Sequence, residues 1–186
     1  MGMSCAWAID VIAGTKASIE EPLLEKGINL QNDCRLKFAG RNSASEGCTA
    51  FFNSLVLYEF KKEVARDHDP SVKLVNSLPT ASGNAAIVAS WSIQDELSCL
   101  GRFGPFFRNM GHAVGLMKLK QSQAVYLYDP NYGVFKWRQE SGVSLKSDLK
   151  QYMLRTGVYG RRVKMEAAMK ISTDNHIPAN NHVIPY

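Results

Sequence analysis

Several features that assign a chain to a structural class are missing from this 186-residue sequence. Polar residues interrupt every apolar run well before the roughly 18 residues needed to cross a bilayer, which predicts no transmembrane helix. The N-terminus lacks the basic region, apolar core and cleavage site of a classical signal peptide, so export through the general secretory route is not expected. There is no internal repeat and no low-complexity segment, which points away from fibrous and disordered classes.

Cysteine and histidine are scarce, and their spacing excludes the common metal and redox motifs. The four cysteines form no CxxC pair and lie far apart: Cys5, Cys34, Cys48 and Cys99. This spacing argues against zinc sites and thioredoxin-like sites, and we expect free thiols. Three of the four histidines lack the spacing of metal ligands. We therefore expect no metal ion and no cofactor.

The charge is moderately positive and mostly scattered along the chain. Lys and Arg number 22 against 17 Asp and Glu, a formal net charge of +5, and hydrophobic residues make up 45% of the sequence. Only the stretch Arg155 to Lys164 concentrates positive charge, and no nucleic-acid-binding motif accompanies it. The composition therefore predicts an ordinary globular protein with no nucleic-acid partner.

The order of the predicted elements favours an α+β fold. Helical spacing of apolar residues and capping signals predict four helices, at residues 18–26, 45–66, 85–100 and 145–154, with an irregular stretch between the first two. Short β-type runs predict strands at residues 112–120, 124–128, 134–138 and 161–171. We expect N-terminal helices followed by a small antiparallel sheet. A single domain would span residues 1–172, and residues 173–186 would form a flexible tail.

His112 and Asp129 are the first candidate site residues. His112 opens one predicted strand, and Asp129 closes the next strand 17 residues later, just before Pro130. If the two strands form a hairpin, both side chains lie at the same end of the sheet. An imidazole held by a carboxylate is the pair that orients and activates a nucleophile in acyl-transfer enzymes. Taken singly, however, His112 could be a core histidine, and Asp129 could serve only to start the turn.

The residues around this pair resemble those of the YopT-like cysteine protease effectors. The resemblance is local, from about His112 to Trp137, and rests on a His-Ala strand start followed by the Asp-Pro-Asn-x-Gly turn of residues 129–133. It implies a papain-like cysteine-hydrolase fold, a Cys-His-Asp triad and delivery into a host cell.

Two cysteines are candidates for the nucleophile. Cys48 opens the strongest helical segment, where a helix N-terminus lowers a thiol pKa, and the nearby Asn42 could supply an oxyanion-hole donor. Against it, a capping box at Ser43 and Glu46 would start the helix earlier and bury the thiol. Cys5 is the alternative, because its 107-residue separation from His112 fits the YopT-like family better than the 64 residues of Cys48. Either thiol could also be a small buried hydrophobe.

These residues predict a thiol hydrolase site, and the resemblance implies a secreted bacterial virulence effector that acts on a host protein. The resemblance makes a small GTPase one candidate target, and a specialised secretion system, with its apparatus or a chaperone as partner, the expected route. A deamidase or acyltransferase on the same fold, a cell-wall amidase and a non-catalytic effector that binds a host signalling protein are the alternatives. The start Met1 to Ala6 approaches a myristoylation pattern, so weak membrane association is a further expectation.

Overall fold

The computed structural model describes residues 1–12, 24–57, 60–65, 68–94, 110–120, 124–138, 144–156 and 162–173. Its helices are α1 (Gly2–Ile12), α2 (Leu24–Phe38), α3 (Ala44–Ser54), α4 (His68–Ser77) and α5 (Leu145–Arg155). Its strands are β1 (Lys61–Val64), β2 (Ala85–Gln94), β3 (Met110–Lys118), β4 (Val125–Asp129), β5 (Gly133–Trp137) and β6 (Arg162–Ser172). The predicted α+β class is confirmed.

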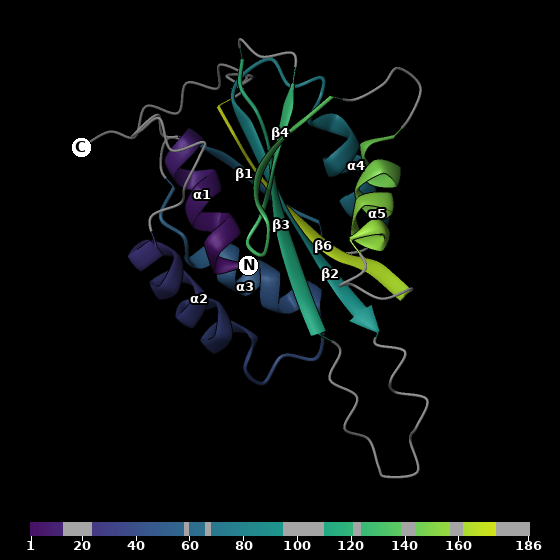
Figure 1. Cartoon of the computed structure of the whole chain (residues 1–186). Coiled ribbons are helices and arrows are strands. Elements are labelled where there is room, and N and C mark those ends of the chain that lie inside the picture. Colours follow the sequence, from purple (N-terminus) through teal and green to yellow (C-terminus); the bar gives the residue numbers. More distant parts are fainter. Residues whose placement is uncertain are drawn as a thin grey trace, which may run out of the picture.

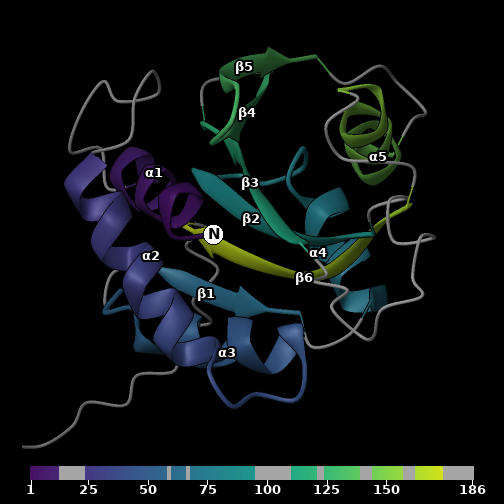
Figure 2. The same cartoon turned by 60° about the horizontal axis from the view of Figure 1, so that its bottom comes forward.

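One antiparallel sheet organises the molecule, with strand order β1-β6-β2-β3-β4-β5. Helices cover both of its faces (Figures 1 and 2). On one face α1 and α3 pack against the sheet, and α2 lies over them; on the other face lie α4 and α5. Each face has its own cluster of buried side chains, so the sheet separates two cores.

The three consecutive strands β3, β4 and β5 lie where the sequence predicts them, and each pairs with the next as an antiparallel hairpin. Helix α5 and strand β6 also match the predicted helix at residues 145–154 and the predicted strand at residues 161–171. Helix α5 begins after Ser144, whose hydroxyl accepts a hydrogen bond from the backbone N–H of Ser147. This is an ordinary N-cap.

Residues 85–100 were predicted to form a helix, but residues 85–94 form strand β2. The run Ala-Ala-Ile-Val-Ala-Ser-Trp is apolar without alternation because β2 lies between β3 and β6 and is covered on both faces. A central strand buried on both sides and a buried helix show the same continuous apolar pattern. Residues 95–100, which include Cys99, lie outside the described part of the chain.

Other helix boundaries also differ from the prediction. Helix α3 ends at Ser54 rather than near residue 66, and residues 61–64 form strand β1. The stretch predicted to be irregular forms helix α2, which continues through Gly27, and α4 lies where no element was predicted. Most of the helix predicted at residues 18–26 lies outside the described residues. Helix α1 was not predicted. Tertiary packing overrides local signals in each case. The predicted tail lies outside the described residues beyond Thr173.

No helix in the described ranges is both long enough and apolar enough to span a membrane.

Candidate active site

The turn after β4 holds Asp129 in a defined geometry. Asp129 pairs with Gly133 across a three-residue loop, and the backbone N–H of Tyr132 donates to the Asp129 carbonyl at 3.0 Å. Gly133 closes the loop with a φ of +98°, a conformation that favours glycine. The Asn131 N–H donates to Oδ1 of Asp129 at 2.9 Å. The Asp-Pro-Asn-Tyr-Gly sequence therefore fixes both the backbone and the carboxylate of Asp129.

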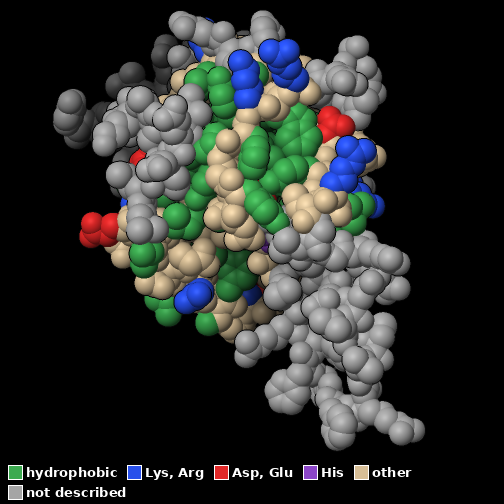
Figure 3. Space-filling model, viewed as in Figure 1, with side chains coloured by type: hydrophobic (Ala, Val, Ile, Leu, Met, Phe, Trp, Pro, Cys, Tyr) green, Lys and Arg blue, Asp and Glu red, His purple; other side chains and the backbone are tan. Residues whose placement is uncertain are grey.

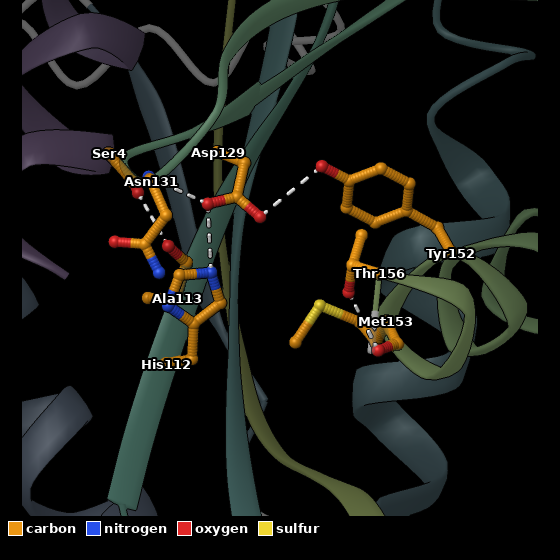
Figure 4. Close-up of polar contacts among 8 residues, drawn as sticks. All are labelled: Ser4, His112, Ala113, Asp129, Asn131, Tyr152, Met153 and Thr156. Atoms are coloured by element: carbon orange, nitrogen blue, oxygen red, sulfur yellow. Dashed lines mark hydrogen bonds and ion pairs between the residues drawn. The ribbon is translucent and has the colours of Figure 1, made fainter. Parts of the chain in front are cut away.

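The structure brings His112 and Asp129 together. The His112 Nε2 atom lies 3.1 Å from Oδ1 of Asp129. Regular pairing of β3 with β4 begins at Gly115 and Tyr128, so His112 lies beyond the paired region and the Asp129 carboxylate reaches across to it (Figure 4). The His112 side chain is 11% exposed and that of Asp129 is fully buried. The imidazole is thus the member of the pair that a substrate can reach.

Tyr152 of α5 contacts the second oxygen of the same carboxylate. Its hydroxyl lies 3.4 Å from Oδ2 of Asp129, on the side opposite His112 (Figure 4). Burial, and then the nearby Asp129 charge, raise the pKa of Tyr152. The phenol therefore stays protonated and donates to the carboxylate. His112, the Asn131 N–H and the Tyr152 hydroxyl together surround the buried charge with polar groups, as a buried carboxylate requires.

The described cysteines are free, buried thiols without thiolate character. These are Cys5, Cys34 and Cys48. Burial raises the pKa of Cys5 and of Cys48 from 9.0 to about 12. The expected lowering at a helix N-terminus does not operate on Cys48, because α3 begins at Ala44 and Cys48 is its fifth residue. The helix dipole acts mainly within the first turn. Both thiols are protonated at neutral pH in this conformation.

The sheet lies between these thiols and the pair. Cys5 and Cys48 belong to the core under α1, α2 and α3. Trp91 belongs to the core on the other face, and it pairs in register with His112. Residues paired across an antiparallel ladder point to the same face. His112 therefore lies on the α4–α5 face, as Asp129 does. The structure unites two of the predicted triad members and leaves the thiols behind the sheet.

The first turn of α1 reaches the edge of β3 beside His112. The Ser4 hydroxyl is buried and donates to the carbonyl of Ala113, the residue after His112, at 2.9 Å. Gly115 permits this approach, since a Cβ there would lie 2.7 Å from the Trp7 ring. A helix N-terminus thus abuts the strand that carries the histidine (Figure 4). Cys5 is the next residue of that turn.

Asn42 lies away from the pair, in the exposed loop ahead of α3. Its backbone N–H donates to Oε2 of Glu46 at 3.2 Å, and the Ser43 hydroxyl accepts from the Glu46 N–H at 3.2 Å. Ser43 therefore caps α3 as the sequence suggested, with Glu46 bonded to the residue before the cap, and the helix starts ahead of Cys48. In this structure, Asn42 serves the start of α3.

Sequence reasoning missed Tyr152 and Ser4. No spacing signal links either to His112, because their contacts join α5 and α1 to strands distant in sequence. Trp91 lies in the core, and its indole N–H is buried with no hydrogen-bond partner among the described residues.

No family model matches this chain, and no curated protein sequence matches it significantly. Among solved structures the chain is similar to the Pseudomonas avirulence protein AvrPphB, with a TM-score of 0.43 and 14% sequence identity. The likeness covers 92% of this chain and 88% of that protein. At this TM-score and identity it supports no conclusion about function.

Proposed function

We propose that the chain is a papain-like thiol hydrolase in which His112 and Asp129 form the acid–base unit. The observation that carries the proposal is the 3.1 Å contact between His112 Nε2 and the fully buried Asp129 carboxylate. A buried carboxylate fixes the tautomer and the orientation of an imidazole and stabilises its protonated form during catalysis. A second support is the partial exposure of the imidazole, which leaves it accessible while its carboxylate partner is buried.

The proposed chemistry is acyl transfer. Because Nε2 carries the carboxylate contact, Nδ1 of His112 takes the proton from the cysteine thiol. The thiolate attacks the carbonyl carbon of the substrate, and His112 returns the proton to the leaving amine as the carbon–nitrogen bond breaks. Water, deprotonated by His112, then hydrolyses the thioester and restores the thiol. Deamidation follows the same course with ammonia as leaving group, and acyl transfer replaces water by an amine.

Cys5 becomes the stronger nucleophile candidate, with Cys48 as the alternative. Cys5 lies in the first turn of α1, the helix whose Ser4 contacts the residue beside His112. One residue corresponds to about 100° around a helix. Rotation of α1 by that amount would exchange Ser4 and Cys5 at β3. Cys48 lies a turn deep in α3, and activating it would require a larger rearrangement of the core.

The expected setting is that of a bacterial effector acting on a host protein. The support is the local resemblance of residues 112–137 to the YopT-like effectors. The proposal includes delivery by a specialised secretion system and a host signalling protein, such as a small GTPase, as target.

The decisive experiment is iodoacetamide labelling of the native protein at neutral pH, mapped by mass spectrometry. We expect one cysteine to react fastest and to lose that advantage in His112→Ala. The variant Ser4→Cys tests the site independently, because it puts a thiol where α1 meets β3. Fast labelling at position 4 that requires His112 would support the proposed site. Slow, uniform labelling of the native thiols and of the introduced thiol, unchanged by His112→Ala, would refute the hydrolase.

The burial of the thiols favours a second candidate, a non-catalytic effector. Cys5 and Cys48 are each fully buried behind the sheet, and burial holds their pKa at about 12. In such a protein the His112–Asp129 pair would serve the hairpin alone, and the chain would act by binding a host protein. The refuting outcome of the labelling experiment is the one that this candidate predicts.

A further inference from the structure

A cavity opens between the end of β5 and helix α5, next to the candidate active site. It has a volume of about 600 Å³. Trp137 and Tyr152 line it, with ring centroids 5.8 Å apart in an edge-to-face contact. The Tyr152 hydroxyl that contacts Asp129 belongs to the same ring. The cavity therefore shares a wall with the candidate site.

The charges at this cavity are predominantly positive. Arg138 follows β5 and Arg155 ends α5, and both line the cavity with exposed side chains. Asp148 is the only acidic residue in the described lining, so the described lining carries a net charge of +1. Apolar side chains gather on the face that Figure 3 shows, with Lys and Arg and a few acidic side chains at its margin. Phe135 of β5 and Tyr132 of the turn before it are exposed aromatic residues.

We propose that this cavity binds an acidic peptide segment of the substrate protein. An aromatic or apolar side chain of the segment packs on Trp137 and Tyr152, and flanking carboxylates bind the guanidinium groups of Arg138 and Arg155. Arginine suits this role because its planar fork of donors matches a carboxylate. The inference rests on the proposed function only in taking the bound segment to be part of the substrate.

Fluorescence polarisation with two labelled probes tests the proposal. The probes are the peptides acetyl-Glu-Glu-Phe-Glu-Glu-amide and acetyl-Lys-Lys-Phe-Lys-Lys-amide, each carrying fluorescein. We expect the acidic peptide to bind at low ionic strength and to weaken with added salt, and the basic peptide not to bind. In the double variant Arg138→Gln/Arg155→Gln, the acidic peptide should bind about 2- to 30-fold more weakly, the loss expected for two exposed ion pairs.

The matched control is Arg35→Gln/Arg41→Gln. It removes the same charge from exposed arginines of α2 and the following loop, away from the cavity. Equal weakening in both double variants would show that net charge alone attracts the peptide, and would overturn the proposal. Absence of binding, or equal binding of the basic peptide, would overturn it as well. The binding assay needs no turnover. A negative binding result therefore does not bear on the thiol labelling, and a negative labelling result does not bear on peptide binding.

Discussion

Asp129 serves a turn and a histidine at once. The sequence left open whether this residue starts the hairpin loop or orients His112, and the structure shows that one oxygen, Oδ1, does both. The two interpretations are compatible, because a carboxylate oxygen accepts more than one hydrogen bond. The turn geometry positions the carboxylate before any substrate arrives.

The variant Asp129→Asn separates these two roles. The amide keeps an oxygen that can accept from the Asn131 N–H, so we expect unfolding free energy to fall by no more than about 2 kcal/mol. It cannot stabilise an imidazolium as a carboxylate does, so His112-dependent labelling of the most reactive thiol should slow by about tenfold or more. The labelling rate of the most reactive thiol and a urea titration measure the two effects. An unchanged labelling rate with reduced stability would mean that Asp129 serves the turn alone.

A conservative substitution of Tyr152 tests whether its contact with Oδ2 of Asp129 positions the carboxylate. Tyr152→Phe removes the hydroxyl that lies 3.4 Å from Oδ2 and keeps the ring against Trp137. We expect a loss of about 1 kcal/mol in unfolding free energy and slower His112-dependent labelling, because Asp129 loses a donor. Tyr126→Phe is the control, since it makes the same change on β4 at a half-buried ring. If both variants behave alike, the hydroxyl of Tyr152 does not position Asp129.

The pair could be predicted from sequence because a hairpin relates nearby residues by register. His112 and Asp129 lie on adjacent strands joined by a short connection, so short β-type runs and a turn signal sufficed. Tyr152 and Ser4 could not be found in this way, since their positions depend on how α5 and α1 pack. The face occupied by Cys48 depends on packing in the same manner. Candidate thiols are easily listed from a sequence, but their accessibility is not.

At the scale of elements, the close contact of α1 with β3 depends on a residue without a side chain. A Cβ at Gly115 would lie 2.7 Å from Cε3 of Trp7, whose ring also stacks on Tyr128 with centroids 5.4 Å apart. The Trp7 ring therefore cannot move away from an added Cβ without losing its stacking on Tyr128. A short β-type run placed residue 115 in a predicted strand, but nothing in the sequence indicated that α1 would lie over it.

Replacing Gly115 by alanine should therefore push α1 away from the sheet. We expect a loss of about 1–3 kcal/mol in unfolding free energy, the usual cost of overpacking a core. Gly111→Ala is a matched control on the same strand, because a Cβ at Gly111 would meet nothing within 4 Å. It should change stability by less than about 0.5 kcal/mol. Equal effects of the two variants in urea denaturation would show that α1 is not seated on Gly115.

The Ala-rich strand β2 was predicted as a helix, although the start of the element at residue 85 was predicted correctly. Its residues are buried on both faces, so the run is apolar without alternation and no local pattern separates it from a buried helix. Alanine also has the highest intrinsic helix propensity, which favoured the wrong assignment. The pairing of β2 with both β3 and β6 decides its conformation, and such long-range pairing leaves no local signal.

At the scale of the whole molecule, the two-faced sheet divides acid–base chemistry from the thiols. One core carries His112 and Asp129 at its edge, and the other encloses Cys5 and Cys48. A protein organised in this way must either rearrange the α1 side to act as a thiol hydrolase or do without the thiols. The burial of the thiols in this structure can be tested in solution through a property of the folded protein.

That property is the dependence of stability on alkaline pH. Burial raises the pKa of Cys5 and Cys48 from 9.0 to about 12, so between these values the unfolded chain loses protons that the folded chain keeps. Stability is then fully present below pH 9 and falls above it, by about 1.4 kcal/mol per pH unit for each thiol. We expect urea midpoints to decline between pH 9 and 10.5 more steeply in the native protein than in Cys5→Ala/Cys48→Ala. Parallel declines would show that the thiols are solvated in solution, as an open, reactive α1 would require.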